Sequence, residues 1–145
     1  MENLTSQILI SNYKRIPIRI SKTKHLIIKA KINGIEGRFI LDTGASNSCV
    51  ALEYENFFNI ASSESDTTAA GAGAVGMKTK ISFANNLQIS RWKNTNFSII
   101  ILDLSHVNTA LQNYKVKPVN GIIGADLLIN NQAVIDYSNK ILYLK

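Results

Sequence analysis

Residues 39–46 have the sequence Phe-Ile-Leu-Asp-Thr-Gly-Ala-Ser, and this stretch decides how the rest of the chain is interpreted. Its apolar residues predict the end of a buried strand. Asp42 ends that strand with a carboxylate, which is costly to bury unpaired. Gly44 lets another backbone approach closely, and the small residues after it leave space over the carboxylate. The stretch predicts either a chemically active Asp42 or an ordinary Asp-x-Gly turn that closes a hairpin.

Strand patterns extend outward from this stretch on both sides. Upstream, isoleucines alternate with other residues over 16–20, and residues 25–32 form an apolar run rich in β-branched side chains. The Asn-Gly pair within residues 33–37 predicts the turn of a hairpin whose second strand covers 38–41. Downstream, residues 97–104 predict a continuous apolar strand.

The remaining segments complete a mainly β pattern. Residues 107–114 predict a short helix, and residues 133–144 predict a hairpin with its turn at 137–139. Residues 62–68 are polar and predict a loop, and Asn85-Asn86 interrupts the strand pattern. Many short strands at regular spacing favour one barrel-like domain over residues 1–145. Residues 1–20 are expected to be an N-terminal extension or a strand used in dimer formation.

Composition excludes several classes of function. The chain has 145 residues, of which 46% are hydrophobic, with one cysteine and a net charge of +6. The densest group of positive side chains, within residues 14–31, alternates with apolar residues, which is typical of the solvated face of a sheet. Aromatic residues make up 8% and fall mainly in apolar, core-like runs, whereas a basic barrel that binds nucleic acid needs them among its cations. We expect neither nucleic acid nor a membrane as a partner.

The sequence lacks the residue patterns that metal sites, cofactor sites and cysteine nucleophiles require. The two histidines, His25 and His106, lie far apart in the chain, and no cluster has metal-ligand spacing, so we expect no metal or cofactor. Cys49 has no base close to it in sequence and is interpreted as a small buried thiol. No run approaches ~18 apolar residues, and no signal peptide is evident, so the expected location is cytoplasmic.

The motif Asp42-Thr43-Gly44, preceded by two large apolar residues and followed by Ala45-Ser46, resembles the active-site motif of aspartic peptidases. Three more segments follow in the matching order. Residues 70–73 resemble the flap hairpin, residues 121–128 resemble the segment behind the catalytic loop, and residues 133–144 resemble the closing hairpin of single-domain members. The similarity covers about residues 26–144. It implies a mainly β, retropepsin-like acid-protease fold: a small closed β-barrel with a flap hairpin and one or two short helices.

The resemblance also implies a mechanism. Hydrolysis by two aspartates that share one proton needs two carboxylates held close together. The chain has five aspartates, and only Asp42 is followed by Thr-Gly. The resemblance therefore implies an aspartic endopeptidase, active as a homodimer, that cleaves a peptide or protein in an extended conformation. The alternative is a catalytically weak retropepsin-like module for dimerisation or peptide binding. Ser46 stands where the retroviral pattern usually has an acidic residue, which leaves that alternative open.

Roles for single residues come from the same resemblance. Asp42 would be the shared acid and base, Thr43 would hydrogen-bond across the dimer axis, and Gly44 would let the substrate backbone approach. Asp126 is either a structural carboxylate, tied to nearby backbone or to an arginine, or a subsite residue. The positions implied to bind substrate are Ala45, Ser46, Asn47, Gly71, Ala72, Gly73, Ala74, Ile123 and Gly124.

Overall fold

The computed structural model describes residues 4–10, 12–65 and 78–145. Its elements in chain order are α1 (Leu4–Ile10), β1 (Lys14–Pro17), β2 (Arg19–Ile20), β3 (Leu26–Ile32), β4 (Ile35–Leu41), β5 (Cys49–Ala51), the 3₁₀ turn η1 (Leu52–Tyr54), β6 (Ser63–Ser65), β7 (Thr79–Ile89), β8 (Trp92–Leu102), α2 (Ser105–Asn113), β9 (Gly121–Ile123), α3 (Ala125–Asn130), β10 (Val134–Asp136) and β11 (Ile141–Leu144). The predicted mainly β architecture is therefore observed.

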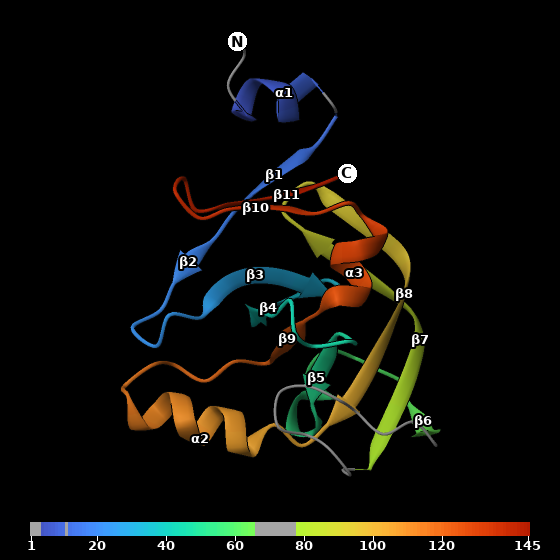
Figure 1. Ribbon diagram of the computed structural model, residues 1–145. Coiled ribbons are helices and arrows are strands. Elements are labelled where there is room, and N and C mark those ends of the chain that lie inside the picture. Colours follow the sequence, from blue (N-terminus) through green and yellow to red (C-terminus); the bar gives the residue numbers. More distant parts are fainter. Residues whose placement is uncertain (1–3, 11, 66–77) are drawn as a thin grey trace.

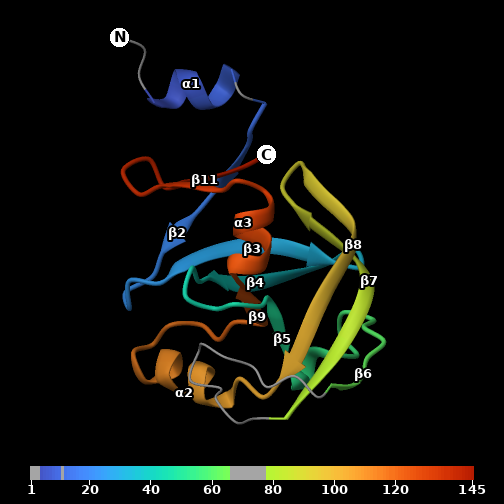
Figure 2. The ribbon, with the colours of Figure 1, turned by 45° about the vertical axis from the view of Figure 1, so that its right-hand side comes forward.

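Six strands close into a barrel. Their order is β3-β4-β9-β5-β8-β7, and β7 pairs back onto β3 through Lys31–Gln88 and Ile32–Leu87. The β4–β9 and β5–β8 pairs are parallel, and the other pairs are antiparallel. Strands β2 and β6 extend the sheet at its two ends (Figures 1 and 2). Closure leaves the barrel strands with few free edges, which limits pairing with other chains.

Alternation along the strands produces two apolar clusters. On one face of β3 and β4, Ile28 and Phe39 point into the main core of the barrel. On the other face, Ile27 and Ile40 pack with Leu111 of α2 in a second cluster. Because side chains of a strand alternate between faces, one run of apolar residues serves both clusters. Helix α2 therefore covers only that part of the outer face where the strand residues are apolar.

A second, three-stranded sheet contains the first and the last strand of the chain. Its order is β1-β11-β10, and β1 pairs with β11 of the same chain, Ile16 opposite Leu142. The predicted strand within residues 16–20 is thus confirmed as β1 and β2, whereas a use between two chains stays a prediction. Helix α1 lies beyond this sheet, at the end of the molecule opposite α2 (Figures 1 and 2). The sequence did not predict α1.

Local predictions had mixed outcomes. The helix expected at 107–114 is confirmed as α2, and the hairpin expected at 133–144 is confirmed as β10 and β11. The loop expected at 62–68 was wrong in part, because residues 63–65 form β6 and pair with β7. The break expected at Asn85-Asn86 was also wrong: both residues lie inside β7, where the register shifts. There the buried amide of Asn85 donates to the Phe97 carbonyl over 3.3 Å.

Among the described residues, no helix has both the length and the apolar character needed to cross a membrane.

Candidate active site

Asp42 is the first residue after β4, and its backbone holds it in a tight turn. Its amide donates to the carbonyl of Ile123 over 2.9 Å, which continues the parallel pairing of β4 with β9. Its carboxylate Oδ1 accepts a hydrogen bond from the Gly44 amide over 2.8 Å. The Ala45 amide then donates to the Asp42 carbonyl over 3.3 Å. The turn thus orients one carboxylate oxygen of Asp42. The Asp42 side chain is half-buried.

The residues after Asp42 divide into exposed and buried positions. Thr43, Gly44, Ser46 and Asn47 are exposed, whereas Ala45 is buried under the turn. The turn therefore presents a hydroxyl, an open glycine and two polar side chains at the surface beside the carboxylate. Exposure of Thr43, Gly44, Ser46 and Asn47 leaves them accessible for the contacts that the resemblance implied, whereas the burial of Ala45 disfavours the substrate contact expected of it.

A hydrogen-bonded network supports this turn from below. The Ser48 hydroxyl donates to Asp126 Oδ1 over 2.8 Å, and the Ser48 amide donates to Asp126 Oδ2 over 3.0 Å. The same hydroxyl accepts from the Gly124 amide over 2.9 Å. The Ala125 amide reaches the Ala45 carbonyl over 2.7 Å. Both oxygens of Asp126 are engaged locally, so its hydrogen bonds match the structural interpretation of this residue.

Two other predicted site residues are buried. Ile123 is Leu41's partner in the β4–β9 pair and is 1% exposed, with its side chain in the barrel core. Gly124 follows it and is also buried. Their burial favours support of the turn rather than direct contact with a ligand. The four predicted flap positions, Gly71, Ala72, Gly73 and Ala74, lie outside the described residues.

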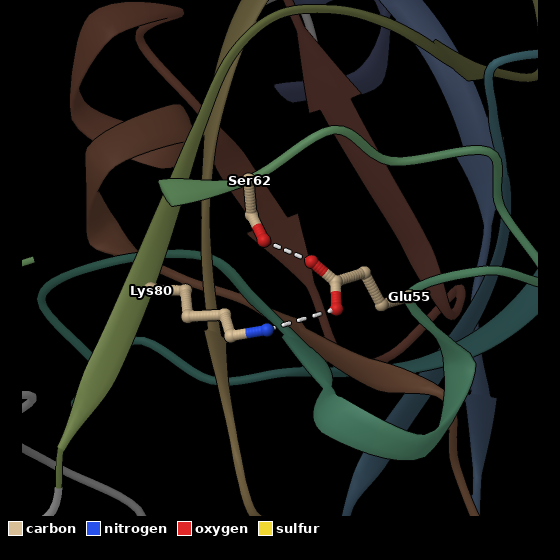
Figure 3. A network of polar contacts seen from close by, with 3 residues as sticks. All are labelled: Glu55, Ser62 and Lys80. Carbon is tan, nitrogen blue, oxygen red and sulfur yellow. Dashed lines mark hydrogen bonds and ion pairs between the residues drawn. The ribbon is translucent and has the colours of Figure 1, made fainter. Parts of the chain in front are cut away.

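The strands that flank the flap positions are described, and a polar network joins them to the loop after β5. Strands β6 and β7 pair antiparallel, with Glu64 opposite Lys80. The carboxylate of Glu55 accepts a hydrogen bond from the Ser62 hydroxyl and forms an ion pair with Lys80 Nζ at 3.3 Å (Figure 3). Glu55 is 17% exposed, so this pair is partly shielded from solvent. The network therefore ties β7 and the residue before β6 to the segment after η1.

Cys49 lies close to the turn but does not take part in its chemistry. It is the only cysteine in the chain and is buried. Burial is the main cause that raises the pKa of its thiol to about 12; a hydrogen bond with the Ile122 backbone opposes this shift, and the nearby carboxylates of Asp126 and Asp42 add to it. A thiol with such a pKa is not a nucleophile near neutral pH. The interpretation of Cys49 as a small buried thiol is confirmed.

An apolar depression of about 420 Å³ opens beside Thr43. Its walls come from α3 and the segment that leads into β10, and they include Leu128, Ile129 and Ile135. Ile129 is 75% exposed, although it is a large aliphatic residue. Exposed aliphatic surface beside a polar turn is typical of a protein contact.

Metal-ligand chemistry has no counterpart around Asp42. Nowhere in residues 4–10, 12–65 and 78–145 do three or more His, Cys, Asp or Glu side chains converge as a metal site would require. Sequence reasoning missed Ser48, whose partners Gly124 and Asp126 lie more than 70 positions away along the chain. No local signal pointed to it, because a serine after a small-residue turn is ordinary.

Comparison with known proteins agrees with this geometry. The family model described as aspartyl protease matches residues 28–127. A retropepsin-like aspartic protease from Rickettsia conorii is similar in structure, with a TM-score of 0.62, 19% identity, and coverage of 92% of this chain and 90% of that chain. No curated protein matches the sequence.

Two further solved structures are similar. EIAV protease, solved in complex with the inhibitor HBY-793, gives a TM-score of 0.56 and 18% identity, with coverage of 77% of this chain and 92% of that one. The retroviral protease-like domain of Ddi1 from Leishmania major gives a TM-score of 0.56 and 16% identity, with coverage of 83% and 88%. At these identities the similarities show the fold alone, and the predicted retropepsin-like fold is confirmed.

Proposed function

This chain belongs to the aspartyl protease family, and from that premise we propose that it is an aspartic endopeptidase whose active site forms between two copies of the chain. The observation that carries the proposal is the position of Asp42. Its carboxylate stands at the mouth of a rigid turn, with one oxygen held by the Gly44 amide and with exposed Thr43 beside it. A second carboxylate brought beside it would complete a dyad.

The second carboxylate would come from the other copy. Asp126 is bound to Ser48 through both oxygens, and Asp66 lies outside the described residues. Asp103, just before α2, and Asp136, at the end of β10, each accept hydrogen bonds from residues that follow them in the chain. A two-fold axis beside Thr43 would place Asp42 next to its own symmetry mate. Two carboxylates about 3 Å apart cannot both be ionised, so the pair would share one proton.

The chemistry follows from that shared proton. The ionised carboxylate accepts a proton from a water molecule as that water attacks the carbonyl carbon of the scissile bond, and the protonated carboxylate donates to the carbonyl oxygen. The tetrahedral intermediate then collapses, and the leaving nitrogen takes a proton from the dyad. Ser46 and Asn47, exposed next to the turn, would line the extended peptide. Gly71, Ala72, Gly73 and Ala74 would cover it from the flap.

The depression beside Thr43 supports the homodimer. Ile129 exposes most of its side chain there, and burying it against a second copy would stabilise the pair by about 1.5–3 kcal/mol per side chain. Ile129→Asp is therefore expected to abolish dimerisation and cleavage together while the fold persists. The matched control is Tyr114→Asp, which places the same charge on another exposed residue, at the end of α2. Dimerisation that survives Ile129→Asp would reject this face.

The direct test is cleavage of a mixed peptide library from acid to neutral pH by the wild type and by Asp42→Asn. This substitution keeps the shape of the side chain and removes the carboxylate that must share the proton. The matched control is Asp103→Asn, the same change at an exposed aspartate. We expect cleavage by the wild type and the control only. Absence of cleavage by all three, at concentrations where the dimer is measured, would favour the peptide-binding module instead.

A further inference from the structure

A basic groove of about 830 Å³ lies on the outer face of β3 and β4, apart from the Asp42 turn. Among the described residues that line it, five side chains are positive and Glu36 is the one carboxylate. These positive side chains, which we call the groove cations, are Arg19, Lys29, Lys31, Arg38 and Lys117. They come from four separate parts of the chain, and the fold alone brings them together.

Two groove cations face each other without an internal counter-ion. Lys29 and Arg38 are direct partners in the antiparallel β3–β4 pair, so their side chains lie on the same face about 5 Å apart at Cβ. Like charges placed directly opposite each other destabilise a sheet. Neither side chain forms an ion pair with any described residue, and Arg38 Nε is buried without a hydrogen-bond partner. This arrangement lowers the stability of the fold. An anion bound between the two side chains would offset that loss.

The groove is preformed. Toward Asp42, the outer face is filled by Ile27, Ile40 and the residues of α2 that pack on them. The opposite wall is the loop before β9, which is bonded to β4: the Arg38 amide donates to Asn120 Oδ1 over 2.8 Å, and the Asn120 amide donates to the Arg38 carbonyl over 2.7 Å. Lys117 lies in this loop, three residues before Asn120, and lines the same groove as Lys29 and Arg38, so a ligand need not order this wall.

The chemistry of the lining selects among anions. Among the lining residues that the structure describes, none is aromatic, so they offer no stacking platform of the kind that single-stranded nucleic acids use. A guanidinium beside ammonium groups suits carboxylates, which it binds through paired hydrogen bonds. Arg19 belongs to β2, one of the two terminal strands of the sheet, where an extended peptide can add. These features favour a polypeptide with acidic side chains.

We propose that the groove cations bind an acidic segment of another polypeptide. Arg38 lies in β4, four residues before Asp42, which directly follows that strand. The two residues are therefore about 13 Å apart along the strand direction. An acidic segment held there could belong to the protein being cleaved; that use rests on the proposed peptidase function, whereas the binding does not. Asp42→Asn is therefore expected to bind such a peptide as the wild type does.

Fluorescence anisotropy with a labelled oligo-glutamate peptide tests the proposal. The double substitution Lys29→Gln/Arg38→Gln is expected to raise Kd roughly tenfold or more. The control Lys78→Gln/Lys145→Gln removes the same charge at exposed positions that do not line the groove, and should leave Kd within about twofold. Equal effects of the two double variants, or no binding by the wild type, would overturn the proposal.

Two further measurements control for misfolding of the Arg38 variant and for nucleic-acid binding. Lys31→Gln/Lys117→Gln changes only exposed side chains, so it should weaken peptide binding without unfolding the chain, even if the Arg38 variant fails to fold. A labelled oligo-thymidine strand should bind more weakly than the peptide. If it binds more tightly, with the same dependence on Lys31 and Lys117, the groove is a nucleic-acid site and the peptide assignment is wrong.

Discussion

Gly124 passes so close beneath the loop of Asp42 that a Cβ on it would lie 2.5 Å from the carbonyl oxygen of Ala45. That oxygen belongs to backbone and accepts a hydrogen bond from the Ala125 amide, so it has little freedom to move. The backbone at Gly124 has φ −112°, which other residues adopt readily. Glycine is therefore needed for the close approach and not for its conformational freedom.

Gly124→Ala is accordingly expected to displace the Asp42 turn. We predict a loss of about 1–3 kcal/mol in the free energy of unfolding, measured by urea denaturation, together with loss of peptide cleavage. Gly34→Ala is the control: it has positive φ but no atom within 4 Å of its Cβ. It should cost about 1 kcal/mol and leave cleavage unchanged. Wild-type stability and activity in Gly124→Ala would contradict the close packing.

Ser48→Ala removes the hydroxyl that links the Gly124 amide to the carboxylate of Asp126 beneath the Asp42 turn. The Gly124 amide and Asp126 Oδ1 would each lose a partner, so we predict a loss of about 1–3 kcal/mol in stability. Ser46→Ala, at an exposed position of the same loop, should change stability by less than about 0.5 kcal/mol. Equal effects of the two substitutions in thermal unfolding would show that the network does not support the turn.

Asn108 ties α2 to the segment before β9. Its buried amide donates to the Val119 carbonyl over 3.0 Å and accepts from the Val119 amide over 2.7 Å. Asn108→Ala leaves both backbone groups buried without partners, and we predict a loss of about 2 kcal/mol or more. Asn113→Ala, on the exposed end of the same helix, is the control in urea unfolding. A small effect at Asn108 would mean that water reaches Val119.

Cys49 is predicted to resist alkylation while the chain is folded. With a thiol pKa of about 12, roughly one molecule in 10,000 carries the thiolate at pH 8, and the side chain is also buried. Mass spectrometry after treatment with iodoacetamide should find unmodified protein under native conditions and complete modification in denaturant. Rapid native labelling would place Cys49 at an accessible, activated position.

Asp136 should make stability depend on acid pH. The side-chain amide of Asn139, and next its backbone amide, hydrogen-bond this carboxylate and lower its pKa below the usual 3.8. A lowered folded pKa adds stability above the unfolded pKa, and that stability is lost as pH falls through the folded value. Asn139→Ala should therefore lower Tm near pH 7, with a difference that shrinks as pH falls below 3.8. Asn130→Ala, exposed at the end of α3, should show no such trend.

Much of this fold was predictable from local signals. The apolar run over residues 25–32 and the Asn-Gly pair predicted β3 and its hairpin with β4, although β4 begins at Ile35 and not at residue 38, so the turn is shorter than expected. The prediction failed at Asn85-Asn86, because asparagines usually mark turns. In the structure, Asn85 satisfies its amide inside β7, through Ser82 and the Phe97 carbonyl. Hydrogen-bond partners on a neighbouring strand overrode the local preference there.

Some features of the candidate site were likewise predictable from local sequence, and others depend on tertiary contacts. The sequence by itself determined that Asp42 ends a buried strand in a turn with Thr43 and Gly44, since period and residue type are local properties. Only the tertiary structure decided that Ser48 and Asp126 support this turn and that Lys29 and Arg38 share a groove with Lys117. Those relationships join the loop before β5 to α3, and the β3–β4 hairpin to the loop before β9. Side-chain periodicity carries no information about which distant segments will become neighbours.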